Sequence, residues 1–103
     1  MAIAKETKNF IDSLIDYYIS EAASYKQIAE SYVPEINSVA DTAFGIISGC
    51  VYSGFLQAYQ NQEKTPDLED IKEFNKILKD RAPLIKKAIL EDPDSPKKNT
   101  SEE

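Results

Sequence analysis

Histidine is absent from this chain of 103 residues, and cysteine occurs once, as Cys50. Without histidine the chain cannot form a Ser-His-Asp or Cys-His catalytic arrangement or a histidine-ligated zinc, haem or di-iron site. A single thiol forms neither an internal disulfide nor a thiolate metal cluster, and such cysteine usage is typical of a reducing, intracellular setting. We therefore expect a cytoplasmic protein that is not an enzyme and needs no cofactor.

Clusters of positive charge and apolar runs near the N-terminus are also missing. The formal net charge is -6, with 29% charged residues and no strongly basic stretch. Non-specific nucleic-acid binding requires Lys and Arg to neutralise phosphates, so we do not expect it. Charges begin again at Lys5, Glu6 and Lys8, before any apolar run long enough for a signal peptide. Length and composition favour one soluble, mildly acidic domain with a single modest core.

Glycine is scarce, and its placement is unusual. Gly45, Gly49 and Gly54 are the only glycines, and all lie in the uncharged stretch 42–62, which otherwise resembles the interior of a helix. Glycine inside a helix costs roughly 0.5–1 kcal/mol relative to alanine. Close packing of another backbone is the usual compensation. The pattern predicts that this stretch is the most tightly packed part of the protein, or the place where a partner docks.

The first two segments with helical periodicity meet at Pro34. Apolar residues spaced alternately by four and three from Ile11 to Tyr32 predict one long amphipathic helix. Pro34 should end it and begin the second helix, which runs to about Asn61. That second helix has one broad apolar face. Its opposite face combines small and aromatic residues: Ser38, Thr42, Gly45, Gly49, Tyr52, Leu56 and Tyr59.

The third periodic segment begins with Thr65 as the predicted N-cap and Pro66 in the first helical position. Apolar residues keep heptad spacing from Leu68 to Ile89. Pro83 removes one backbone hydrogen bond within this pattern and predicts a kink or break. The remainder, 92–103, contains no apolar residue and is expected to be a disordered acidic tail.

Three segments of similar length, about 26 residues or ~39 Å each, predict an all-α fold. Short connections favour an antiparallel up-down-up bundle occupying residues 1–91 as a single domain. Its core should contain the residues that continue the apolar faces of the helices. These are Leu14, Tyr18, Ile36, Ala43, Ile47, Val51, Phe55, Leu68, Ile71, Phe74, Leu78 and Ile85.

The central segment has two competing interpretations besides a buried soluble helix. A β-hairpin through Gly49 lacks the alternation of polar and apolar residues that strands require. A membrane span needs ~20 predominantly apolar residues, whereas polar side chains such as Ser48, Ser53 and Gln57 interrupt this run. The soluble helix is favoured, and a membrane-associated subunit remains an alternative.

Three acidic residues are candidates for chemistry. Asp41 lies beside the glycine-bearing face, where burial would raise its pKa and suit it to act as a general base or binding group. Its plainer interpretation is a carboxylate that is solvated or bonded to a tyrosine. Asp12 and Asp16 stand one helical turn apart, where two carboxylates can share Mg²⁺ or Ca²⁺. A solvated helix face has the same pattern, and no metal site is predicted.

Six tyrosines are more than a small apolar core requires. A tyrosine buries a large ring while its hydroxyl seeks water or a hydrogen bond. The excess indicates a subunit interface, a groove for an apolar or peptide ligand, or the rim of the core. The interface or groove candidates are Ser38, Asp41, Thr42, Gly45, Gly49, Tyr52, Leu56, Tyr59, Tyr17 and Tyr25.

The sequence as a whole predicts a small intracellular interaction module that associates with itself, most simply as a two-fold homodimer. The alternative is a helical binding protein with a tyrosine-lined pocket for an apolar or peptide ligand. Another protein is a possible partner under either hypothesis. A membrane-associated subunit comes third, and nucleic acid is not expected as a partner.

Overall fold

A computed structural model describes residues 2–91. Within that range the chain forms the helices α1 (Lys5–Ser20), α2 (Ala22–Glu30), α3 (Val39–Asn61) and α4 (Leu68–Leu90), and no strand. The all-α prediction is confirmed, whereas the prediction of three helices is wrong because there are four. The tail predicted to be disordered, 92–103, lies outside the described residues.

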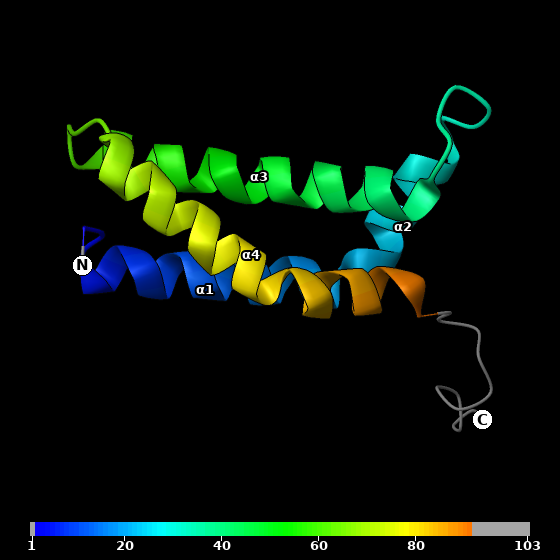
Figure 1. Ribbon diagram of the computed structural model, residues 1–103, viewed down its shortest axis with the longest axis horizontal. Helices are drawn as coiled ribbons and strands as arrows, with labels where there is room; N and C mark the ends of the chain where they lie inside the picture. Colours follow the sequence, from blue (N-terminus) through cyan, green and yellow to red (C-terminus); the bar gives the residue numbers. More distant parts are fainter. Residues whose placement is uncertain (1, 92–103) are drawn as a thin grey trace.

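The predicted first helix is divided at Glu21. The Ser20 hydroxyl donates a hydrogen bond to the Tyr17 carbonyl at 2.6 Å, and the Glu21 backbone leaves the helical region at φ -106°, ψ 15°. A serine side chain that bonds the preceding turn competes with regular helical hydrogen bonding. The chain therefore changes direction, and α2 rises from the level of α1 to that of α3 (Figure 1).

The start of α3 also differs from the prediction. Pro34 lies in the loop of residues 31–38 and does not begin a helix. Ser38 is the N-cap instead, and its hydroxyl accepts the Asp41 backbone N–H at 3.0 Å. A hydroxyl at this position satisfies one of the unpaired N–H groups of the first turn. Ser38 thus has a structural role within the chain.

A capping box sets the start of α4. The Asp67 side chain accepts the Asp70 backbone N–H at 2.9 Å, and the Asp70 side chain accepts the Asp67 N–H at 3.0 Å. The prediction of Thr65 as N-cap is therefore wrong, because this reciprocal pair satisfies two N–H groups at once. The helix continues through Pro83 to Leu90 without a break, and its ribbon bends where yellow passes into orange (Figure 1).

The core lies between α1, α3 and α4, with α2 closing one end. Figure 1 shows α3 running back above α1, while α4 crosses from the end of α3 toward the C-terminal part of α1. Each helix contacts the three others. The buried apolar side chains are Ile3, Ile11, Ile15, Ala22, Ala29, Ala43, Ile47, Val51, Phe55, Tyr59, Phe74, Ile77, Ile85 and Ile89.

Half of the predicted core is fully buried. Ala43, Ile47, Val51, Phe55, Phe74 and Ile85 belong to this group, whereas Leu14, Tyr18, Ile36, Ile71 and Leu78 are only partly buried. Leu68 is 64% exposed, so its prediction is wrong. It is the first residue of α4, and the buried side of that first turn is taken by Asp70, which is 9% exposed.

Candidate functional site

The exposed side of α3 carries a narrow stripe of Gly45, Gly49, Tyr52 and Leu56, which we call the α3 stripe. Their spacing of four, three and four residues places them on one helix face. A Cβ atom built at Gly45 or Gly49 meets nothing within 4 Å. Tyr52 and Leu56 are each 37% exposed. Within the described chain, no other segment covers this stripe where the glycines lie.

Gly54 is the glycine that packs closely. A Cβ atom there would collide with the Leu14 side chain, and a ring carbon of Phe10 lies 3.8 Å away. This position therefore permits a close approach of α1 to α3. The prediction of tight packing is right at Gly54 and wrong for the single chain at Gly45 and Gly49, because the pattern does not distinguish covered from open glycines.

Asp41, at one end of the α3 stripe, is an exposed carboxylate paired with a lysine. Lys86 of α4 donates from Nζ to Asp41 Oδ1 at 2.6 Å. This hydrogen bond and the lysine charge hold the pKa of the Asp41 carboxyl below its ordinary value. The prediction that the pKa of Asp41 is raised, as a general base would need, is therefore wrong. The alternative, an exposed carboxylate with a hydrogen-bond partner, is correct, although the partner is a lysine and not a tyrosine.

The candidate tyrosines fall into two separate groups. Tyr17, Tyr18 and Tyr25 form a row on α1 and α2, with successive ring centroids 5.1 and 5.4 Å apart. Tyr52 packs on Phe74 at 5.5 Å, while Tyr59 is buried on α3. The first group lies on α1 and α2, and the second lies on α3. Thr42 is half-buried, and its backbone N–H donates to the Ser38 carbonyl at 3.1 Å.

The two aspartates considered for a shared cation bind a guanidinium instead. Arg81 of α4 pairs with Asp16 and lies 3.8 Å from Asp12 Oδ1, while Lys8 pairs with Asp12 Oδ2 at 2.9 Å. The positive charges that two such carboxylates require are thus supplied by the chain itself. Within residues 2–91, no group of three or more potential metal-ligating side chains comes together.

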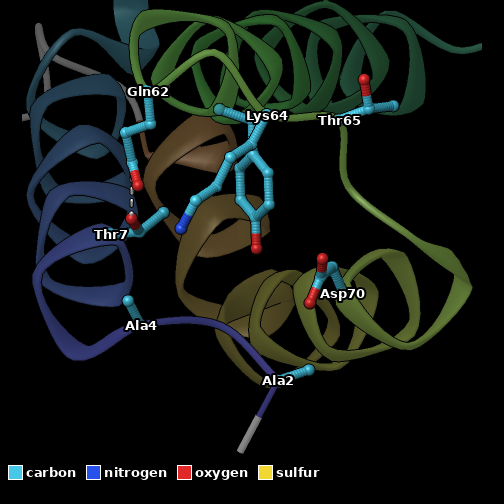
Figure 2. Close-up of a pocket in the computed structure, with 8 residues that line it drawn as sticks. Ala2, Ala4, Thr7, Gln62, Lys64, Thr65 and Asp70 are labelled. Carbon is cyan, nitrogen blue, oxygen red and sulfur yellow. Dashed lines mark hydrogen bonds between the residues drawn. The ribbon is translucent and has the colours of Figure 1, made fainter.

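A polar pocket of about 310 Å³ lies at the end of the bundle where α3 ends and α4 begins. Figure 2 shows Lys64 reaching into it from the connecting loop, with Thr7 on one side and Asp70 on the other. Gln62 donates to the Thr7 hydroxyl at 3.3 Å. The lining residues are Ala2, Ala4, Thr7, Tyr59, Gln62, Lys64, Thr65 and Asp70.

Sequence reasoning did not identify this pocket, although two signals pointed toward it. Thr7 continues the four-residue spacing of Ile11 and Ile15, and it is correspondingly buried, with 6% exposed. Asp67 and Asp70 have the three-residue spacing of a capping box. The N-terminal segment completes the pocket, because the Ala2 and Ile3 N–H groups both donate to Glu73 Oε1, at 2.8 and 3.0 Å.

Two tyrosine hydroxyls resist ionisation. Burial, reinforced by the nearby Asp70 carboxylate, raises the pKa of Tyr59 to about 12. Burial, reinforced by Cys50 and then by Tyr25 and Tyr17, raises the pKa of Tyr18 to about 12. The folded state therefore favours the protonated form of both groups.

Alkaline titration should consequently unfold the protein. Because folding raises the pKa of Tyr18 and Tyr59, their protonated forms contribute to the stability of the folded state below the ordinary tyrosine pKa near 10. This contribution to stability is lost as the pH rises toward 12. We expect tyrosinate absorbance in that range to grow together with loss of the helical circular-dichroism signal. Tyr59→Phe removes one of the two hydroxyls, so this variant should lose less stability than the wild type as the pH rises toward 12. Tyr59→Phe unfolding at the same pH as the wild type would contradict the expectation.

Comparison of the chain with protein-family models, with curated proteins and with solved structures finds no match. The function is therefore argued from the residues and their geometry. Among residues 2–91, α3 is the one helix that is long and apolar enough to cross a membrane, and 22% of its most apolar stretch is buried within the bundle.

Proposed function

We propose that the protein is a self-associating interaction module of the cytoplasm and that two copies pair through the α3 stripe. The open glycines carry this proposal. An exposed glycine within a helix costs roughly 0.5–1 kcal/mol relative to alanine, and in the single chain Gly45 and Gly49 have no close neighbour in return. A second helix lying across them would use the space that they leave.

The stripe is complementary to itself in shape. Its N-terminal half consists of Gly45 and Gly49, and its C-terminal half of Tyr52 and Leu56. Two copies related by a two-fold axis and crossing antiparallel would place the large half of each against the small half of the other. A two-fold interface requires such self-complementarity. In this arrangement Leu56 of one copy faces Gly45 of the second, and Tyr52 faces Gly49.

Charge also permits this pairing. Residues 42–62 contain no ionisable acid or base apart from tyrosine and cysteine, so two copies bring together no like charges along the contact. The helix dipoles run in opposite directions when the helices are antiparallel, which avoids placing like ends together. Tyr52 is a suitable anchor because aromatic residues are enriched at the centres of interfaces.

The mass of the protein in solution tests the proposal. Light scattering at concentrations up to about 1 mM should show a species of twice the 11.6 kDa monomer mass. The dimer should dissociate on dilution and should not need detergent. A wild-type protein that remains monomeric over the whole concentration range would refute the homodimer.

Membrane association through α3 is the second candidate, because the helix has the length and hydropathy of a span and is little buried. Insertion would require α3 to leave the bundle and withdraw Ile47, Val51 and Phe55 from the core, where each is 0% exposed. Ser53 and Gln57 would also have to enter lipid. Co-flotation with phosphatidylcholine vesicles decides between the candidates: the homodimer should stay at the bottom of the gradient, and an inserted subunit should float.

A further inference from the structure

We infer that the polar pocket between Lys64 and Asp70 binds a small zwitterion, of the class of free α-amino acids. The two charged side chains line the same pocket of about 310 Å³, and Figure 2 shows them on opposite sides of the cavity. The Lys64 ammonium is suited to bind the carboxylate of the ligand, and the Asp70 carboxylate is suited to bind its ammonium group. The inference is independent of the α3 stripe.

Lys64 supplies a cation that no described carboxylate neutralises. Its backbone N–H is bonded to the Tyr59 carbonyl at 2.9 Å, which fixes the residue directly after α3. Within residues 2–91, no carboxylate lies within ion-pair distance of its ammonium group. Figure 2 shows the side chain directed into the pocket. A lysine ammonium with three free donors is a suitable partner for a ligand carboxylate.

Asp70 supplies the opposite charge from within the fold. The carboxylate is 9% exposed, and its Oδ2 atom accepts the Asp67 N–H at 3.0 Å. An ionised carboxylate can accept about four hydrogen bonds. Asp70 interacts with the Asp67 N–H and with the Tyr59 hydroxyl, so part of its capacity remains toward the pocket. Asp67 and Glu73 lie close enough to add negative potential at the neighbouring Tyr59 hydroxyl. This side of the pocket therefore favours an ammonium group.

The remaining lining is suited to a small ligand. Thr7 and Gln62 are joined by a hydrogen bond that holds α1 beside the end of α3. Ala2 and Ala4 close the other side, and this segment is fastened to α4 through Glu73. The volume lies at the lower end of the range for small-molecule sites. A pocket of about 310 Å³ favours a small zwitterion, such as one whose ammonium and carboxylate groups are attached to the same carbon.

A thermal-shift screen of the twenty amino acids, each at about 10 mM, provides the first measurement. The amino acid with the largest shift is then titrated by ¹H–¹⁵N NMR. We expect saturable binding with a Kd below about 1 mM and chemical-shift changes concentrated at Thr7, Gln62, Lys64 and Asp70. Two analogues of the same amino acid, one lacking the amine and one with the carboxylate converted to an amide, should each bind about tenfold more weakly.

Variants test the two charges separately. Lys64→Met and Asp70→Asn should each weaken binding about tenfold or more, while Lys64→Arg should retain it. Asp70→Asn keeps an oxygen that can cap α4, and circular dichroism will show whether the helix is preserved. Lys79→Met removes the same charge from the exposed surface of α4 and should leave binding unchanged.

Three results would overturn the inference. These are no saturable binding by any of the twenty amino acids, equal binding of the analogue without an amine, and unchanged binding in both Lys64→Met and Asp70→Asn. Equal binding of that analogue would identify a carboxylate site only.

Discussion

Replacement of Phe74 by alanine is expected to lower the free energy of unfolding by about 3–5 kcal/mol, the usual range for removing a buried aromatic ring. Phe74 is 1% exposed. It stacks on Phe55 with ring centroids 4.5 Å apart and an interplanar angle of 19°, so it joins α4 to α3 at the centre of the core. A small domain has only about 5–15 kcal/mol of stability in total. The variant should therefore lose a large share of its free energy of unfolding.

Chemical denaturation followed by circular dichroism measures this loss. Leu68→Ala is the matched control, because Leu68 begins the same helix and is 64% exposed. It should change the free energy of unfolding by less than about 1 kcal/mol. A Phe74→Ala variant that loses no more than Leu68→Ala would mean that α3 and α4 do not pack through these rings.

Gly49→Leu should convert the proposed homodimer into a stable monomer. In the single chain a side chain at this position meets nothing within 4 Å of its first carbon, and leucine favours the helix by up to ~1 kcal/mol over glycine. The monomer should therefore keep its helical signal and melt no lower than before. In the dimer, the same side chain would occupy the space proposed for Tyr52 of the second copy. Gly45→Leu should act in the same way against Leu56.

Light scattering and thermal melting of the same samples separate the outcomes. Asn75→Leu places the same apolar side chain at an exposed position of α4 and should leave the mass of the wild-type assembly unchanged. If Gly49→Leu and Gly45→Leu remain dimeric, the α3 stripe is not the interface. A dimer could then still exist through another surface, and only the wild-type mass measurement decides that point.

The apolar periodicity of the sequence was sufficient to predict much of the fold. In α3, the side chains of Ala43, Ile47, Val51 and Phe55 are all 0% exposed, as their spacing indicates. Their burial could be predicted because a helix buries one continuous face regardless of which neighbours cover it. The long apolar pattern through Pro83 likewise predicted where α4 extends, although it did not decide between a bend and a break.

Local hydrogen bonds limited what could be predicted. The pattern of Ile15, Tyr18 and Ala22 continues across the end of α1, so periodicity alone predicts one helix where the Ser20 hydroxyl and the Glu21 backbone produce two. The start of α4 was misplaced for a related reason, because Thr65 and Asp67 are both good N-cap residues. Only the reciprocal bonds with Asp70 decide between them.

The candidate sites were harder to predict because they depend on contacts between distant segments. The glycine pattern predicts close packing along α3, and only the contact of Leu14 with Gly54 shows which glycine the chain itself covers. The polar pocket brings Thr7, Lys64 and Asp70 together from three separate segments. No short motif links these residues, so their meeting could be found only in the folded chain.

The contact of every helix with the three others has a consequence for how the protein loses its structure. Withdrawal of any helix would expose apolar faces on all of the rest, so a partly opened bundle keeps little of the stability of the whole. Even the short α2, of only 9 residues, contacts both α3 and α4. We therefore expect residues 2–91 to unfold as a single cooperative unit, and a cut in either long loop to leave fragments that lack a core of their own.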